Sequence, residues 1–172
     1  MNLIKQGFLL ASSFLFCSSL YAQLINSFPY NYAFENENQG STSCGATYLM
    51  QEPGWSNGLS DDIDWTADAG GTGSTGTGPS IDQAPGSSSG RYMYTETSGC
   101  ANDLAYLETP YFDFTSLAIP QIDFWYHMQG ATMGTLALEA KTGANGVWTQ
   151  VLAPFTDNLN AWQQQVVALG AY

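Results

Sequence analysis

Ile-Asp-Phe-Trp-Tyr-His-Met, at residues 122–128, is the stretch that decides the class of fold. Every second side chain in it is apolar, and an extended backbone turns alternate side chains to opposite faces. One face therefore carries Ile, Phe, Tyr and Met, and the other carries Asp, Trp and His. Because both faces bear large side chains, we expect a central strand of a sheet.

The alternation continues toward the C-terminus. Residues 136–141 place apolar side chains on one face, and residues 147–151 resume the pattern after a turn that contains Asn145-Gly146. An Asn-Gly pair supplies the positive φ angles of a tight hairpin turn, so we predict a β-hairpin here. Residues 162–169 give a further strand.

Shorter strands are expected on the N-terminal side. Residues 91–96 carry Tyr92 and Tyr94 on one face, and residues 28–34 alternate around Pro29, whose missing N–H limits it to an edge strand. No segment has a convincing helical period. With 14% aromatic residues and 18 glycines, the chain is predicted to be all-β, two antiparallel sheets packed as a β-sandwich resembling a jelly roll.

Residues 69–90 consist almost entirely of Gly, Ser and Thr. The composition alone is that of a flexible linker. However, Trp65 before it and Tyr92 after it both need burial, and neither flank is long enough to form a core of its own. We therefore favour a long functional loop within one domain.

The first 22 residues have the order of a secretory signal peptide, with a cation, a short apolar run and a small-residue end. The predicted cut follows Ala22 and leaves Gln23 first. The run is too short to span a membrane, and no second apolar stretch follows. A lipoprotein signal at Cys17 is the alternative, but the bulky Phe16 stands where such signals carry a small residue.

Removing the predicted signal peptide leaves fifteen acidic residues and two cations, Arg91 and Lys141, for a net charge of −13. So few cations cannot neutralise phosphates, which excludes nucleic acid and anionic lipid as expected partners. The acidity suits either solubility outside the cell or cation binding. Two cysteines remain, Cys44 and Cys100, and in an oxidising compartment we expect them to form a disulfide.

Six ordered motifs resemble landmarks of the MAM domain, a family named after meprin, A5 antigen and receptor phosphatase mu. The most specific is Phe-Trp-Tyr-His-Met-Gln-Gly at 124–130. The others are Phe-Glu at 34–35, Asp-Asp-Ile-Asp-Trp at 61–65, Thr-Gly-Pro-Ser with an acid at 77–82, Gly-Arg-Tyr-Met-Tyr-Thr-Glu at 90–96 and Met-Gly-Thr-Leu at 133–136. The resemblance implies a MAM-like β-sandwich domain over residues 34–172, after a short lead-in at 23–33.

Two departures from the family pattern refine this expectation. Animal members resemble one another in having four cysteines, whereas two remain here after the signal peptide, and the chain has no Asn-X-Ser/Thr acceptor. The low number of cysteines and the missing glycosylation acceptor both favour a bacterial secreted or surface-protein branch. Family members are also longer at the C-terminus, so we expect the domain to be incomplete at Tyr172 and the polypeptide to continue.

The resemblance implies a non-catalytic adhesion or recognition module of a larger secreted or cell-surface protein, which binds a protein or glycan at the cell exterior. The alternative is a carbohydrate-binding jelly-roll module or an accessory domain of a secreted hydrolase or peptidase. Trp125 and Trp148 could stack on sugars, although tryptophans are more often core residues. The acids at 61, 62 and 64 are too close in sequence to flank a glycosidic bond by themselves.

Catalytic and zinc chemistry have little to build on. His127 is the single histidine, and its place within the strand at 122–128 favours packing or hydrogen bonding over general base catalysis. One histidine and two cysteines that are expected to be oxidised do not make a zinc site.

A structural cation is the one expected cofactor. Some MAM domains hold Ca²⁺ or Na⁺ through acids near the first strand and in the Asp-rich loop, which the resemblance transfers to Glu35, Asp62, Asp64 and Asp82. Hard cations prefer several oxygen ligands, as such a set would supply. The competing interpretation is that these acids cap turns and solvate the surface.

Overall fold

The computed structural model describes residues 23–170 and 172, so the predicted signal peptide lies outside the described residues. Ten strands and no helix occur between residues 23 and 170. No helix in this described part is long and apolar enough to cross a membrane. The prediction of an all-β fold is therefore confirmed.

The strands form five two-stranded ladders. Four are antiparallel: β3 (Thr66–Ala69) with β4 (Arg91–Tyr94), β2 (Ser56–Asn57) with β5 (Leu107–Glu108), β7 (Gln121–Met128) with β10 (Leu159–Ala168), and β8 (Glu139–Ala140) with β9 (Thr149–Gln150). The fifth, β1 (Leu24–Ile25) with β6 (Tyr111–Phe112), is parallel, which the expectation of purely antiparallel sheets did not include.

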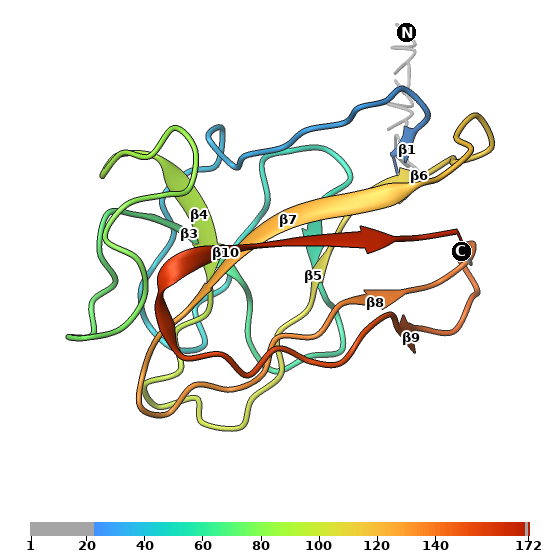
Figure 1. Cartoon of the computed structure of the whole chain (residues 1–172). Helices are drawn as coiled ribbons and strands as arrows, with labels where there is room; N and C mark the ends of the chain where they lie inside the picture. Colours follow the sequence, from blue (N-terminus) through green and yellow to red (C-terminus); the bar gives the residue numbers. More distant parts are fainter. Residues whose placement is uncertain (1–22, 171) are drawn as a thin grey trace, which may run out of the picture.

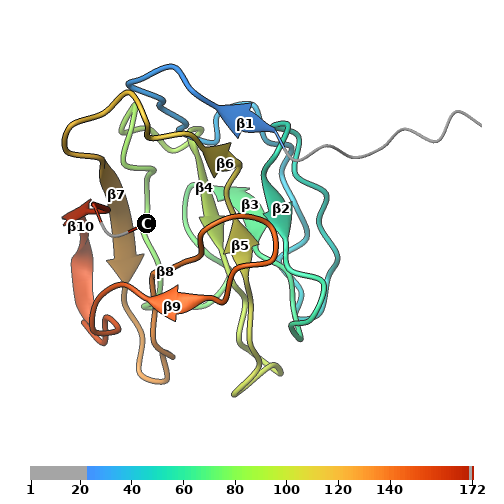
Figure 2. The ribbon, with the colours of Figure 1, turned by 90° about the vertical axis from the view of Figure 1, so that its right-hand side faces the viewer.

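The ladders form the two layers of a β-sandwich. Figure 1 shows β7 and β10 running side by side across the molecule, and Figure 2 shows β2, β3, β4 and β5 in the opposite layer. The layers meet where the rings of Tyr92 and Trp162 lie 6.0 Å apart. Tyr92 is buried, as expected, and so are Ala67 of β3 and Val167 of β10.

The long ladder of β7 and β10 confirms both predicted strands. The predicted central position of the first was wrong, because among the described residues β7 pairs with β10 alone in a two-stranded ladder. Their register runs from Gln121 opposite Ala168 to Met128 opposite Leu159, with an irregularity between Leu159 and Gln163. Phe124 and Tyr126 of β7 both pack their rings against Phe155. The alternating pattern predicted this ladder because its apolar face is half-buried, whereas three of the four residues on the other face are exposed.

The segment at 28–34 is not a strand, and this prediction was wrong. Phe34 has a φ of 65°, in the left-handed region, and its carbonyl accepts the N–H of Glu37, so the chain turns instead of extending. The alternation instead serves two separate ring clusters. Phe28 packs against Phe112 and Phe114, and Tyr32 packs against Phe34 and Trp55.

The hairpin of β8 and β9 is present, but its turn differs from the prediction. The left-handed residue is Gly143, with a φ of 69°, and the N–H of Gly146 bonds to its carbonyl at 3.2 Å. Asn145 is not left-handed, so the Asn-Gly pair does not make the expected turn. The glycine two residues earlier takes that role because it has no Cβ to clash.

The Gly-rich segment at 69–90 is a loop of the same domain. It connects β3 to β4, which pair with each other from Thr66 opposite Tyr94 to Ala69 opposite Arg91. Asp82, in the middle of the loop, is only 1% exposed. This buried side chain fixes the loop against the sandwich. A linker between domains would not be held in this way.

Candidate functional site

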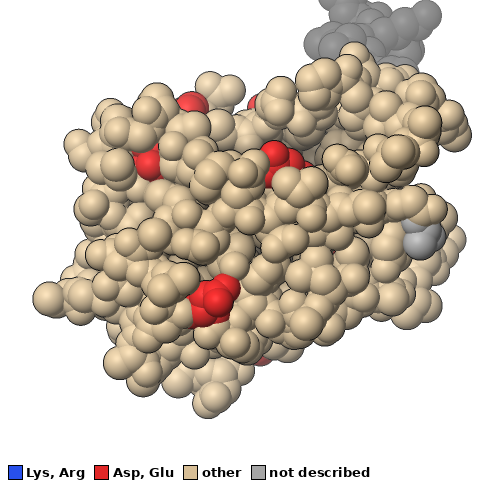
Figure 3. Space-filling model, viewed as in Figure 1, with Lys and Arg blue, Asp and Glu red and all other residues tan. Residues whose placement is uncertain are grey.

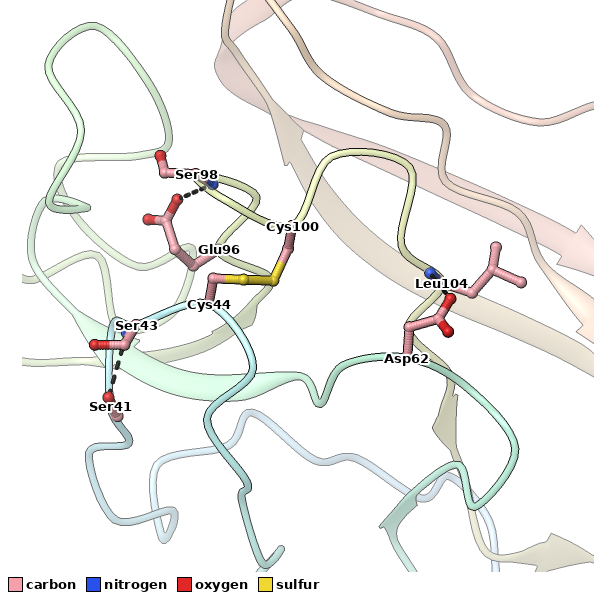
Figure 4. The surroundings of a disulfide bond; sticks show 8 residues. All are labelled: Ser41, Ser43, Cys44, Asp62, Glu96, Ser98, Cys100 and Leu104. Atoms are coloured by element: carbon pink, nitrogen blue, oxygen red, sulfur yellow. Dashed lines mark hydrogen bonds between the residues drawn. A yellow bond between two sulfur atoms is a disulfide. The ribbon is translucent and has the colours of Figure 1, made fainter.

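The predicted disulfide between Cys44 and Cys100 is confirmed. Their Cα atoms are 5.7 Å apart and 56 positions apart in sequence. The bond joins the segment before β2 to the loop that follows β4 (Figure 4). Cys100 is 4% exposed, so the crosslink is sheltered from solvent on that side.

Two of the four predicted cation ligands hold neighbouring loops through backbone amides. Asp62 accepts the N–H of Leu104 at 2.9 Å, a contact visible in Figure 4, and Asp64 accepts the N–H of Tyr48 at 2.6 Å. Asp61, the other acid weighed for glycoside hydrolysis, accepts the N–H of Tyr106 at 2.6 Å. These carboxylates hold neighbouring loops in place through hydrogen bonds. Each carboxylate thereby uses an oxygen that a metal or sugar would need.

The other two predicted ligands approach a common point at the start of β4. Glu35 accepts the N–H of Arg91 at 3.0 Å, and the carboxyl of Asp82 lies so close to Gly90 that a Cβ there would collide with it. One oxygen of Asp82 accepts the N–H of Ser87 at 2.5 Å, whereas its buried Oδ2 has no hydrogen-bond partner among the residues that the structure describes. An unpartnered buried carboxylate oxygen is costly unless a proton or cation satisfies it.

No three His, Cys, Asp or Glu side chains gather in a metal-binding arrangement among the described residues. The predicted ligands are divided between the Glu35 and Asp82 pair and the separate positions of Asp62 and Asp64. The cation site stays a prediction, with Glu35 and Asp82 as the two residues that best fit it.

Glu37 is an important side chain that the sequence did not single out. It is 3% exposed and accepts hydrogen bonds from the hydroxyls of Tyr32 and Tyr48 at 2.5 and 2.8 Å. The N–H groups of Gln51 and Glu52 complete the set at 3.0 and 3.2 Å. Burial alone would raise the pKa of Glu37. The four hydrogen bonds lower the pKa by more than burial raises it, so the net value is below 4.5. The sequence around Glu37 does not reveal these donors, because they lie 5 to 15 positions away along the chain.

His127 has the structural surroundings that its position predicted. Its Nε2 lies 3.3 Å from the side-chain oxygen of Asn160, and its ring packs at 5.5 Å against Trp162. Burial lowers the pKa of His127, partly offset by the bond to Asn160. Its Nδ1 is buried and has no hydrogen-bond partner within the described part of the chain. The imidazole is therefore half-buried beside an amide and an indole.

The two tryptophans considered for sugar stacking are both partly exposed. Trp125 of β7 is 41% exposed and Trp148 is 43% exposed. Lys141 already lies over the ring of Trp148, with its Nζ 4.2 Å from the ring centroid. Trp125 therefore presents the less occupied ring to solvent.

Acidic side chains far outnumber basic ones after residue 22. On the face shown in Figure 3, acidic side chains form separate red patches, and no basic side chain is visible. After Gln23, the sequence contains only Arg91 and Lys141 as basic residues. A basic partner is thus favoured over an acidic one by long-range electrostatics.

Among the described residues, the fold and these side chains define a β-sandwich that is held by one disulfide and by buried, hydrogen-bonded carboxylates. The family model for the MAM domain, meprin/A5/mu, matches residues 33–172. The chain belongs to the MAM domain family, and the resemblance drawn from the six sequence motifs is confirmed at the level of the family.

Proposed function

We propose that this chain is a non-catalytic recognition module of a larger secreted or cell-surface protein, and that it binds a protein ligand outside the cell. Membership of the MAM family carries this proposal, because MAM domains are extracellular adhesion-type modules. The described surface adds support, since it exposes several large apolar side chains of the kind that binding surfaces use. The most exposed are Leu49, Leu59, Ile119 and Val147, at 82%, 103%, 73% and 84%.

A glycan is the second ligand class, in a carbohydrate-binding module or an accessory domain of a secreted hydrolase or peptidase. Trp125 supports it, because its ring is 41% exposed on the outer face of a long strand. Aromatic rings in such positions stack on the apolar faces of sugars. A protein ligand remains the first choice, since the exposed aliphatic side chains above offer no hydrogen bonds to hydroxyl groups.

The test is a binding panel. Purified protein would be measured against immobilised extracellular matrix proteins and, separately, against polysaccharides, with the Trp125→Ala variant alongside. We expect saturable binding to a protein ligand, unchanged in Trp125→Ala, with the ligand recovered intact. Binding to polysaccharide alone, lost in Trp125→Ala, would favour the glycan alternative. Turnover of the ligand, or no binding to either panel, would contradict the proposal.

We also propose that the chain is exported through its first 22 residues and that it belongs to a bacterial branch of the family. The support is the order of charges and apolar residues in that segment and the presence of two cysteines after it. N-terminal sequencing of exported protein should begin at Gln23. Recovery of exported protein that still starts at Met1 would contradict cleavage at this point.

A structural Ca²⁺ or Na⁺ is the last part of this proposal. Its support is the unpartnered Oδ2 of buried Asp82, near which Glu35 also contributes a carboxylate. If a cation binds only the folded state there, millimolar Ca²⁺ should raise Tm relative to chelator. Glu35→Gln should reduce that response, whereas Asp103→Asn, which alters an exposed acid elsewhere, should preserve it. A Tm that is identical in Ca²⁺ and chelator would refute the calcium form of the site.

A further inference from the structure

A groove of about 380 Å³ lies between the segment at 48–50 and the chain from Trp55 to Leu59, which includes β2. Its lining is mainly apolar and includes Met50 and the half-buried Trp55. Leu49 and Leu59 also line it, and they are 82% and 103% exposed. Two fully solvated leucines at one groove are unfavourable in a free module unless a partner covers them.

The walls of this groove are held by side-chain hydrogen bonds. The amide of Asn57 donates to the carbonyls of Tyr48 and Trp65 at 3.0 and 3.1 Å. Asp64 accepts the N–H of Tyr48 at 2.6 Å, and the indole N–H of Trp55 donates to a tyrosine hydroxyl at 3.0 Å. A ligand would therefore meet a preformed surface and would not have to order it, which favours affinity.

The floor of the groove is equally well fixed. Met50 is 8% exposed. Tyr48, which forms one wall, donates a hydrogen bond from its hydroxyl to the buried carboxylate of Glu37 at 2.8 Å. Gly58 donates its N–H to the carbonyl of Tyr106 at 2.8 Å, which holds the other wall. The two exposed leucines thus project from a rigid base, the arrangement expected of binding anchors.

The charge around the groove selects the partner. Asp64 lines it, and Asp61 and Asp62 follow Leu59 closely in the chain. Neither of the two basic residues after Gln23 lines it. Electrostatic complementarity therefore favours a basic ligand. A second copy of this chain would bring the same excess of acids and would be repelled.

We propose that this groove binds an extended segment of a partner protein in which an apolar side chain lies between Leu49 and Leu59 and a neighbouring Lys or Arg faces Asp64. The inference rests on the proposed recognition function and names its surface and the chemistry of its partner. The preformed walls, the two exposed leucines and the acidic edge carry it together.

The test uses a short fluorescein-labelled peptide in which Leu alternates with Lys, and fluorescence anisotropy as the readout. The double variant Leu49→Ser, Leu59→Ser should bind it at least ~10-fold more weakly than the wild type. The matched control is Ile119→Ser, Val147→Ser, which removes two comparably exposed side chains elsewhere and should bind as the wild type does. Unchanged thermal melts would show that both variants are folded.

Charge is tested with a second peptide in which Glu replaces Lys, and it should bind at least ~10-fold more weakly to the wild type. Equal binding of the Lys peptide to the wild type and the groove variant would mean attraction by net charge alone and would overturn the inference. Absence of Lys-peptide binding to the wild type would also overturn it. So would a dimer of the wild type that the groove variant abolishes, because the occupant would then be a second copy.

The ligand panel described above separates this inference from the proposed function. If the groove variant binds the panel ligand as well as the wild type does, recognition stands but uses another surface. If the wild type binds no panel ligand, the proposed function fails whatever the peptide shows.

Discussion

Replacing Glu37 by Gln is the perturbation that tests this structure most directly. The carboxylate is 3% exposed and accepts from four donors, the hydroxyls of Tyr32 and Tyr48 and the N–H groups of Gln51 and Glu52. Gln keeps the size of the side chain but converts one acceptor oxygen into an NH₂ group. That group would face donors, so their hydrogen bonds would be lost and not merely weakened.

The magnitude follows from the number of donors left without an acceptor. A buried unsatisfied donor costs about 1–3 kcal/mol, and one oxygen in place of two leaves about two donors unpaired. We therefore expect Glu37→Gln to lower the free energy of unfolding by about 2–6 kcal/mol. In a domain of this size, that loss should lower Tm by roughly 4–24 °C.

Urea and thermal unfolding, followed by tryptophan fluorescence with the disulfide intact, would measure the change. The control is Glu139→Gln, because Glu139 is an exposed residue of β8 whose carboxylate makes no hydrogen bond with the described residues. Its effect should stay within about 0.5 kcal/mol. Equal stabilities of the two variants would refute the assignment of Glu37 as a buried, fully bonded carboxylate.

The pH dependence gives the same prediction a second readout. The pKa of Glu37 is below 4.5 in the folded protein, because the four donors outweigh the effect of burial. The unfolded chain therefore binds the proton more readily, and stability rises with pH in this range. The contribution of Glu37 is complete above the unfolded pKa and is lost as the pH falls through the folded pKa. Below pH 4.5, the wild type should lose stability more steeply than Glu37→Gln.

Reducing the single disulfide should lower the free energy of unfolding by about 4 kcal/mol, as the loss of a long closed loop predicts, and urea unfolding with and without reductant would show it. An unchanged midpoint would contradict this. Gly90→Ala should destabilise the protein by at least ~2 kcal/mol, because the new Cβ would collide with the carboxyl of Asp82, whereas Gly134→Ala meets no atom within 4 Å and should be tolerated. Comparable melts of these two variants would disprove the close contact. Burial holds the pKa of His127 below 6.5, so its contribution to stability is present above pH 6.5 and is lost as the pH falls through the folded pKa. An NMR titration of the imidazole with a midpoint at or above 6.5 would contradict this.

The prediction from the sequence was most accurate for the two long strands that pair with each other. Residues 121–128 alternate regularly, and in the structure β7 pairs with β10 from Gln121 to Tyr126 and again at Met128. Local alternation failed at residues 28–34, where the aromatic rings face two separate clusters and Phe34 turns the chain. The spacing of rings alone cannot distinguish a sheet face from a segment that distributes its side chains between neighbours.

The acids show the same limit in another form. The sequence shows where carboxylates stand, but not which backbone amides they meet. Asp62 and Asp64, predicted as ligands of one cation, fasten two different loops, while Glu37, which drew no attention, accepts four hydrogen bonds. The pairing of Cys44 with Cys100 was predictable because only two cysteines follow residue 22 in the sequence.

The near absence of basic residues has a consequence for how the domain responds to proteases. Proteases that cut after Lys or Arg find only Arg91 and Lys141 beyond residue 22. Arg91 is held in the ladder of β4 with β3, and Lys141 is stacked on Trp148. Such proteases need a locally unfolded chain, so the folded module should resist digestion in a trypsin-rich environment. Between residues 23 and 172, the unfolded chain offers such proteases cleavage sites at these two residues alone.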